Sequence, residues 1–290
     1  MKKREIKLIE CPRDAMQGIH DFIPTELKIK YLNSLLKVGF NILDFGSFVS
    51  PKAIPQLKDT AEVLSELNLD ETKTKLLAIV ANKRGAEDAS NFDEIDYLGY
   101  PFSVSETFQE RNTNASIEES LSRVEEIQNL CLKNNKELVV YLSMAFGNPY
   151  GDKWNVDIVA NWAEKLHKEL DISILSLSDT IGVSNPENIN YLFSTLVPEF
   201  KKVEFGAHLH TTPTTWEEKI RASVESGCLR YDGAIKGYGG CPMATDELTG
   251  NMPTENMLSY FSKNKLETGL NMDLFNQSMV DSSAIFQEYA

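Results

Sequence analysis

Cysteine is scarce in this chain of 290 residues, and the four cysteines form no Cys-x-x-Cys motif. Such a scattered set argues against a disulfide framework and a zinc ribbon, and it suits a reducing compartment. Nothing approaches the roughly 18 consecutive apolar residues of a membrane helix. The basic first residues lead directly into an expected strand, without the apolar region of a signal peptide. We therefore expect a cytoplasmic protein. The cysteines are Cys11, Cys131, Cys228 and Cys241.

Basic residues are outnumbered by acidic ones, which gives a formal net charge of -14. This balance argues against nucleic acid and a membrane as partners, because phosphate contacts need a basic face. An anionic substrate would have to be held by local basic residues. The chain also has no low-complexity segment and no linker rich in proline, glycine or serine. We therefore expect a single domain over residues 1–290 with a large buried core.

Segments that predict strands alternate with segments that predict helices eight times along the chain. This alternation predicts an α/β fold, a parallel (β/α)8 TIM barrel, with additional C-terminal helices at about 253–264 and 272–287. A doubly wound open sheet is the main alternative. It would usually carry a glycine fingerprint in its first strand–helix turn, and residues 11–15 do not form one. The expected strands are 6–10, 41–45, 75–80, 95–98, 137–143, 172–177, 203–208 and 230–235.

Unusual polar residues stand at the carboxyl ends of the expected strands, where barrel enzymes build their active sites. Any one of them has an ordinary structural explanation, such as a helix cap, a turn or a surface ion pair. So many of them on one rim are better explained by a functional site. In strand order they are Arg13 and Asp14, Asp44 and Ser47, Asn82 and Arg84, Ser143, Asp179, His208 and His210, and Cys241.

The pair His208 and His210 is the strongest sign of a metal. Residues two apart on a strand point to the same face, and histidine is the commonest metal ligand. Two solvated rings at a polar strand end are the alternative reading. With a carboxylate from the first strand, the pair makes a nitrogen and oxygen set without thiolate. Such a set favours Mg²⁺ or Mn²⁺ as the divalent cation, with Zn²⁺ possible.

Cys241 stands apart from the other cysteines because it follows Gly239-Gly240 and precedes Pro242. Glycines allow the backbone to move and allow a thiol to approach a substrate closely. The alternative is a small buried filler, which is the usual fate of a free cysteine. The flanking residues favour a reactive thiol at Cys241, whereas the other three cysteines look structural.

Six motifs, in order and over nearly the whole length, carry a resemblance to a known family. The chain resembles the 3-hydroxy-3-methylglutaryl-CoA lyases, a family of metal-dependent TIM-barrel lyases. The loop with Cys241 is the specific part, and the other motifs are shared with a wider superfamily. The motifs are Pro12-Arg13-Asp14 with Gln17, Ser47-Phe48-Val49-Ser50-Pro51-Lys52, Asn114 to Ser120, Asp179-Thr180-Ile181-Gly182, His208-x-His210, and Gly239-Gly240-Cys241-Pro242 with Gly250-Asn251.

The resemblance implies cleavage of 3-hydroxy-3-methylglutaryl-CoA into acetyl-CoA and acetoacetate, a reaction of leucine degradation and ketone body metabolism. It implies that Arg13 stabilises the enolate oxygen, that Cys241 handles a proton, and that Asp44 and Asp179 support proton transfer and the metal shell. It assigns the cation to Asp14, His208, His210 and Asn251.

The substrate would be an acyl-CoA, which carries phosphates. Gln17 and Ser47 belong to motifs at the site and are candidates for substrate binding. The basic candidates for the coenzyme A phosphates are His20, which stands where the family often has lysine, and Lys52, Arg84 and Arg111. Ordinary solvated charges are the alternative reading for these four residues.

The chain departs from the family pattern at four places. Asp44 stands where glutamate is usual, Thr211 where aspartate follows the second histidine, and Ala15 replaces a glycine. The segment from Cys241 to Asn251 is one residue longer. These differences leave open a lyase for a different 3-hydroxyacyl-CoA.

Two further alternatives come from other classes of protein. One is a Claisen-type acyl-CoA synthase of the isopropylmalate or homocitrate kind, although such enzymes are generally longer and lack the Gly-Gly-Cys-Pro loop. The other is a catalytically inactive metal-binding barrel that acts as an interaction partner. The apolar C-terminal helices allow a possible homodimer or a cap on the barrel.

Overall fold

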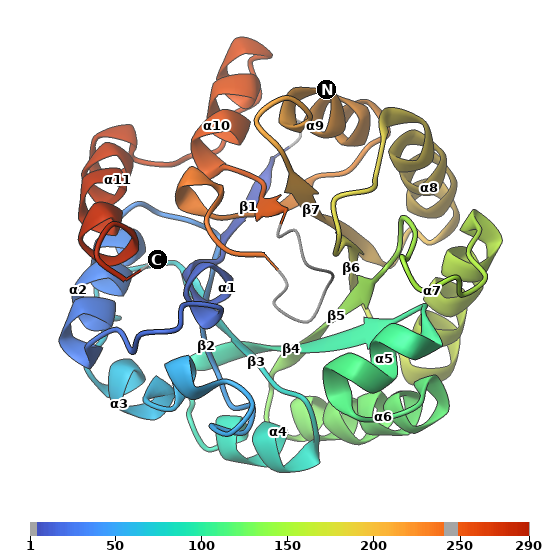
Figure 1. The fold of residues 1–290 in the computed structure, drawn as a ribbon, viewed down its shortest axis with the longest axis horizontal. Helices are drawn as coiled ribbons and strands as arrows, with labels where there is room; N and C mark the ends of the chain where they lie inside the picture. The colour runs from blue at the N-terminus through green and yellow to red at the C-terminus, as the bar shows by residue number, and fades with distance from the viewer. Residues whose placement is uncertain (1–4, 241–248, 290) are drawn as a thin grey trace.

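The computed structural model describes residues 5–240 and 249–289, and it contains a closed barrel of parallel strands (Figure 1). Each strand pairs with the next one in sequence, and pairing of the first with the eighth closes the barrel, with Leu8 opposite Tyr231. The strands are β1 (Lys7–Glu10), β2 (Ile42–Ser47), β3 (Lys75–Ile79), β4 (Ile95–Ser103), β5 (Glu137–Ser143), β6 (Ile174–Asp179), β7 (Glu204–Thr211) and β8 (Arg230–Gly233).

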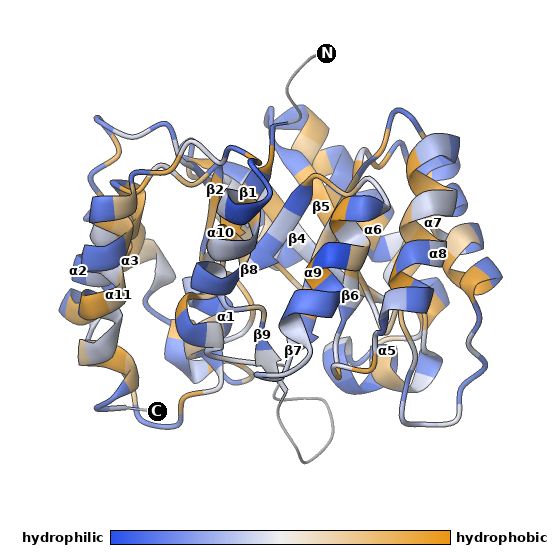
Figure 2. Cartoon of the chain, turned by 90° about the horizontal axis from the view of Figure 1, so that it is seen from above, coloured by the Kyte–Doolittle hydropathy of each residue, from blue (hydrophilic) through white to orange (hydrophobic). Residues whose placement is uncertain are grey.

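Helices surround the barrel, and their hydrophilic and hydrophobic residues lie on different faces (Figure 2). The predicted capping box at the start of α6 is confirmed, because the Ser116 and Glu119 side chains each accept a backbone hydrogen bond from the other residue. The helices are α1 (Pro12–Gln17), α2 (Thr25–Leu36), α3 (Thr60–Ser65), α4 (Lys83–Ser90), α5 (Glu106–Thr113), α6 (Ile117–Lys133), α7 (Val156–Leu170), α8 (Pro186–Glu199), α9 (Trp216–Glu225), α10 (Thr254–Lys263) and α11 (Met272–Phe286), with 3-10 turns at η1 (Pro55–Leu57) and η2 (Ile235–Gly237).

Apolar side chains fill two regions of the molecule. The larger core lies between the outer face of the sheet and the helices. A smaller cluster draws side chains from β1 to β6 and fills the barrel interior, with Ile9, Leu77 and Val139 among its members. The interior is therefore packed, which leaves the carboxyl rim as the place for a cavity. In the two described ranges no helix is long and apolar enough to cross a membrane.

Several strands run further toward the rim than the sequence pattern predicts. Ser47 and Asp179 are the last residues of β2 and β6, and β7 continues to Thr211, so both His208 and His210 lie within a strand. The short helix α1 and a ninth strand, β9 (Gly250–Asn251), antiparallel to β7, are also absent from the prediction. At the rim, strands face a cavity instead of an apolar core, so their last residues are polar and look like loops in the sequence.

Candidate active site

A cavity opens at the carboxyl ends of the strands, and seven of the predicted site residues line it. The polar lining includes Arg13, Asp14, Gln17, Ser47, Ser143, Ser178, Thr180, His208 and His210. The lining also includes apolar residues, among them Val49, Ile54, Pro101 and Phe108. The cavity therefore offers both charged and apolar surface, which suits a substrate with an anionic or oxygen-rich end and a hydrocarbon part.

Asp14, His208 and His210 form a compact group among the polar residues of the lining. One potential ligand atom of each lies within 4.8 Å of those of the other two. Asn251 of β9 lies opposite His210 of β7 and donates a hydrogen bond from Nδ2 to Asp14 Oδ2 at 2.7 Å. The same amide also donates to the carbonyl of Tyr238, which leaves its oxygen as the remaining acceptor. The structure thus brings together the four residues that the resemblance assigns to the cation.

The protonation of this group fits a divalent cation. Burial, together with the neighbouring His208, lowers the pKa of His210 to about 4, so its ring is neutral at ordinary pH. His210 Nδ1 is buried and has no hydrogen-bond partner among the described residues. Burial raises the pKa of Asp14, but Arg13 and the two histidines outweigh this effect and lower it. A neutral imidazole with a free nitrogen beside an ionised carboxylate is the donor set that a hard or borderline cation requires.

Asp232 orients the first histidine of the pair. Asp232 Oδ2 lies 3.1 Å from His208 Nδ1, and the Tyr141 ring meets the imidazole edge-on at 5.7 Å between centroids. Burial lowers the pKa of His208, but the hydrogen bond and charge of Asp232 outweigh it and raise the pKa. With Nδ1 bonded to Asp232, Nε2 is the nitrogen left for a metal. Asp232 could not be predicted as a site residue, because its only signal in the sequence is an acidic residue inside an expected strand.

Arg13 is held rigidly by three acceptors at the edge of the cavity. Its Nε and Nη2 donate to the Asp44 carboxylate, at 3.0 Å and 2.6 Å to Oδ2. Its Nη1 donates to Asp14 Oδ1 at 3.1 Å and to Gln17 Oε1 at 2.8 Å. A guanidinium has five N–H bonds. These contacts occupy four of them, so one hydrogen on Nη2 has no acceptor among them.

Asp44 itself is fully buried and is not part of the cavity lining. Burial raises its pKa to about 6 even though Arg13 opposes the change. Its contacts are those of a residue that positions Arg13.

Asp179 is likewise buried and is not part of the cavity lining. It accepts hydrogen bonds from the backbone and hydroxyl of Ser184, and from Lys219 Nζ at 2.8 Å. Lys219 also donates to the carbonyl of His210 at 2.8 Å. Lys219 could not be predicted either, because nothing in the sequence pattern of α9 distinguishes a buried lysine from a solvated one.

A family model described as HMGL-like matches residues 6–279. The chain belongs to the HMGL-like family. The predicted family is therefore confirmed, and the closed barrel agrees with it.

Relatives in the HMGL-like family are similar over nearly the whole chain. A Bacillus subtilis protein named hydroxymethylglutaryl-CoA lyase YngG is 33% identical over 272 residues, which are 94% of this chain and 89% of that protein. An HMG-CoA lyase structure from Brucella melitensis has a TM-score of 0.90 at 27% identity and covers 98% of this chain and 100% of its own. One from Acinetobacter baumannii, in complex with coenzyme A and 3-methylmalate, has a TM-score of 0.90 at 26% identity, over 99% and 93% of the two chains.

The remaining predicted HMGL-like site residues lie apart from the cavity or outside the described ranges. His20 and Arg84 are exposed and do not line the cavity, and His20 contacts Asp21 at 3.3 Å. Asn82 caps α4 by accepting a hydrogen bond from Gly85, which is its ordinary structural explanation. Cys241 lies outside the described residues.

Proposed function

We propose that this chain is a carbon–carbon lyase that cleaves 3-hydroxy-3-methylglutaryl-CoA into acetyl-CoA and acetoacetate. The observation that carries the proposal is the group of Asp14, His208 and His210 beside the fixed guanidinium of Arg13, in a chain of this family. Relatives over most of the length bear the name hydroxymethylglutaryl-CoA lyase, and one solved relative holds coenzyme A.

The reaction makes two electrostatic demands on the site. The 3-hydroxyl gives up its proton, and the carbon–carbon bond between C2 and C3 breaks. Its electron pair leaves on the thioester fragment as an enolate. A proton then goes to the carbon of that enolate, so that acetyl-CoA and acetoacetate are the products. The site has to stabilise negative charge first at the hydroxyl oxygen and then at the thioester oxygen.

Asp14, His208, His210 and Asn251 would hold the divalent cation, and Mg²⁺ or Mn²⁺ suits their oxygen-rich set, with Zn²⁺ as the alternative. When bound, the cation supplies positive charge that lowers the cost of deprotonating the hydroxyl. Asp232 fixes the ring of His208 by the 3.1 Å hydrogen bond, and the ligand set is therefore held in place before substrate arrives.

Arg13 has the contacts of an enolate stabiliser. Asp44, Asp14 and Gln17 hold its guanidinium in one orientation, so its charge needs no reorganisation as the enolate forms. The free hydrogen on Nη2 is available to the thioester oxygen. We propose Asp44 as a positioning residue for Arg13, and Asp179 as one that acts through Lys219 on the end of β7.

Cys241 is our candidate for the proton donor to the enolate carbon, on the basis of its Gly-Gly-Cys-Pro sequence. Gly239 supports this assignment. A Cβ atom on Gly239 would lie 2.7 Å from Asp14 O and 2.9 Å from Asn251 Nδ2. Glycine is therefore required where the chain passes these two proposed ligands of the cation. The residue two positions before Cys241 therefore packs against the proposed cation ligands.

The substrate class is an acyl-CoA, with Gln17 and Ser47 in the cavity lining as binding candidates. His20, Lys52, Arg84 and Arg111 are exposed, and we keep them as candidates for the coenzyme A phosphates. A homodimer, a cytoplasmic location and a place in leucine or ketone body metabolism stay predictions.

The decisive experiment measures acetoacetate released from 3-hydroxy-3-methylglutaryl-CoA by the purified protein with Mg²⁺ or Mn²⁺. We expect turnover that depends on the cation and that disappears in the double variant His208→Ala/His210→Ala, whose fold is checked by circular dichroism. The alternative is a lyase for a different 3-hydroxyacyl-CoA, which the replacement of the usual glutamate by Asp44 leaves open. Release of acetyl-CoA from such a compound, but not from 3-hydroxy-3-methylglutaryl-CoA, would favour it. No cleavage of either would refute the proposal.

A further inference from the structure

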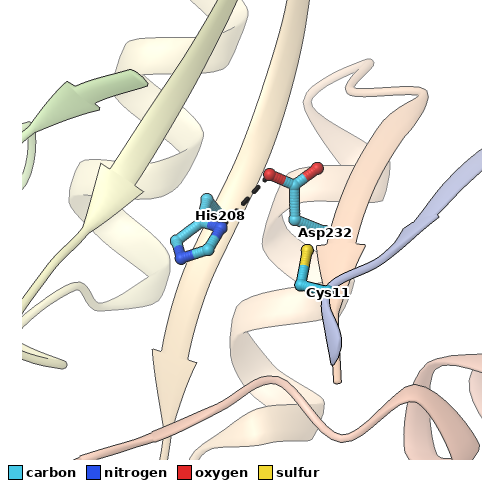
Figure 3. A group of neighbouring side chains, drawn as sticks. All are labelled: Cys11, His208 and Asp232. Carbon is cyan, nitrogen blue, oxygen red and sulfur yellow. Dashed lines mark hydrogen bonds and ion pairs between the residues drawn. The ribbon is translucent and has the colours of Figure 1, made fainter. Parts of the chain in front are cut away.

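A second group of potential metal ligands lies on the other side of His208. Cys11 Sγ, a ring nitrogen of His208 and a carboxylate oxygen of Asp232 lie within 4.8 Å of one another. Figure 3 shows the three side chains converging from β7, β8 and the end of β1. Both β1 and β7 pair with β8, so the barrel itself brings the three positions together.

Two of these side chains have atoms without an adequate partner. Asp232 is 2% exposed, and its Oδ1 has no hydrogen-bond partner among residues 5–240 and 249–289. Cys11 is 1% exposed, and within the described ranges its thiol makes only a long contact of 3.8 Å with the carbonyl of Ile9. A buried carboxylate oxygen without a donor is costly, and although the charge of the buried Arg230 acts on Asp232, Oδ1 is left without a hydrogen bond, so a cation beside it would stabilise it.

We propose that Cys11, His208 and Asp232 form a second site, one for a thiophilic divalent cation of the Zn²⁺ class. Sulfur, imidazole nitrogen and carboxylate oxygen are a donor set that Zn²⁺ and Cd²⁺ accept, whereas Mg²⁺ avoids sulfur. The two negative ligands, a thiolate and a carboxylate, balance the charge of the cation inside the barrel. His208 is 13% exposed and lines the cavity, so the cation reaches the site past its ring.

The two sites share one imidazole, and this makes them mutually exclusive. A neutral imidazole has a lone pair on only one of its two nitrogens. In the protein without the second cation, a proton on Nδ1 would be donated to Asp232 Oδ2, which leaves the Nε2 lone pair for a cation held with Asp14 and His210. When the second cation binds Nδ1, the ring proton moves to Nε2, and the Cys11 thiol proton is released to solvent. Nε2 then no longer ligates a cation in the first site.

A thiophilic cation therefore removes the activating cation, and it inhibits where Mg²⁺ or Mn²⁺ activates. The predicted inhibition rests on the proposed function, but binding to Cys11 and displacement of the activating cation do not. Two measurements made without substrate therefore test the second cation site independently of the proposed lyase activity.

The first measurement follows Cd²⁺ by the ultraviolet charge-transfer band of a cadmium–thiolate bond. The starting protein is the Cys241→Ala variant, so that the thiol outside the described residues does not contribute. We expect one Cd²⁺ per chain with the thiolate band. The band should disappear when Cys11→Ala or Cys11→Ser is added, and it should persist when Cys131→Ala is added as the matched control, since Cys131 is also buried and free. A missing band in the starting protein, or a band that persists without Cys11, overturns the proposal.

The second measurement follows bound Mn²⁺ by electron paramagnetic resonance while Cd²⁺ is added to the same proteins. We expect Cd²⁺ to release Mn²⁺, and we expect about tenfold more Cd²⁺, or a larger excess, to be needed once Cys11 is alanine. Simultaneous binding of one Mn²⁺ and one Cd²⁺ would contradict mutual exclusion. Both measurements follow cation binding alone, so they still test whether the second site exists if the protein fails to cleave 3-hydroxy-3-methylglutaryl-CoA.

Discussion

Lys219 Nζ lies 2.8 Å from Asp179 Oδ2, and both side chains are almost completely shielded from solvent. The same ammonium donates to the carbonyls of Gly182 and His210. One buried lysine of α9 therefore ties the end of β6 and its loop to the strand that carries the two cavity histidines.

Replacing Lys219 with methionine should destabilise the protein strongly. The change leaves the Asp179 carboxylate buried without its cation, and removal of one partner of a buried pair costs about 3–5 kcal/mol. Urea unfolding followed by circular dichroism gives this free energy. Lys168→Met is the matched control, because Lys168 pairs with Glu164 on the exposed face of α7 and its replacement should leave the free energy of unfolding nearly unchanged. Equal losses in the two variants would contradict a structural part for Lys219.

Asp232→Asn should weaken binding of the activating cation without unfolding the barrel. Asparagine keeps the size of the side chain but removes the charge that holds the His208 ring, and loss of such a partner typically costs about 10- to 100-fold in metal affinity. Equilibrium dialysis with Mn²⁺ measures the change. Asp96→Asn serves as control, since Asp96 pairs with Lys75 far from the cavity rim. An unchanged dissociation constant for Mn²⁺ in Asp232→Asn would mean that the 3.1 Å contact does not orient the ligand.

Arg13→Lys should lower kcat far more than it raises KM. Lysine offers a point charge on a flexible stem and loses the fork that donates to Asp44 through Nε and Nη2. The lost interaction strengthens as enolate charge develops, so the loss is expected in kcat, by about 100-fold or more. Steady-state kinetics separate the two constants, and the exposed Arg221→Lys on α9 provides the control. An effect confined to KM would assign Arg13 to substrate binding alone.

The barrel and its functional rim could be predicted because they leave periodic or clustered signals. Eight alternations of strand and helix predict the topology, and His208 and His210 share a face by spacing alone. Polar residues such as Ser47 at strand ends predict the rim because carboxyl ends of parallel strands meet there.

The partners of the site residues leave no such signal. Asp232 and Lys219 become informative only when the fold buries them beside His208 and Asp179. The helix α1 has six residues, which is too short for a helical period to show in the sequence. Arg13 nonetheless lies in the first turn of this helix, so the helix sets the direction of its side chain.

Cys241→Ser should retain cation and substrate binding but lose about 10²- to 10⁴-fold in turnover, the usual range for general acid–base catalysis. A thiol titrates closer to neutral pH than a serine hydroxyl, so serine cannot give a proton as readily at working pH. Single-turnover kinetics with bound substrate measure the loss. Cys131→Ser on α6 is the control and should keep its turnover. Alkylation should inactivate the wild type, and bound substrate should protect it. Near wild-type turnover of Cys241→Ser would remove this cysteine from the mechanism.

Glu10→Gln should remove a pH-dependent loss of stability. Glu10 is fully buried at the end of β1, where it accepts hydrogen bonds from Ile235 N at 2.7 Å and Thr254 Oγ1 at 2.6 Å. Burial outweighs both bonds and raises the pKa of Glu10 from 4.5 to about 8. Between these two values the folded protein holds a proton that the unfolded chain has released. Its stability is therefore full below about pH 4.5 and falls as the pH rises toward 8.

The slope of this loss is about 1.4 kcal/mol for each pH unit in that window. Glutamine keeps both contacts, because its oxygen accepts from Ile235 and its amide donates to the hydroxyl of Thr254, yet it does not titrate. We expect Glu10→Gln to gain stability relative to the wild type as the pH rises from 5 to about 8, in urea unfolding at several pH values. Glu137→Gln, at an exposed position of β5, should keep the wild-type slope. A constant difference between Glu10→Gln and the wild type across this range would show that Glu10 is ionised in the folded protein throughout.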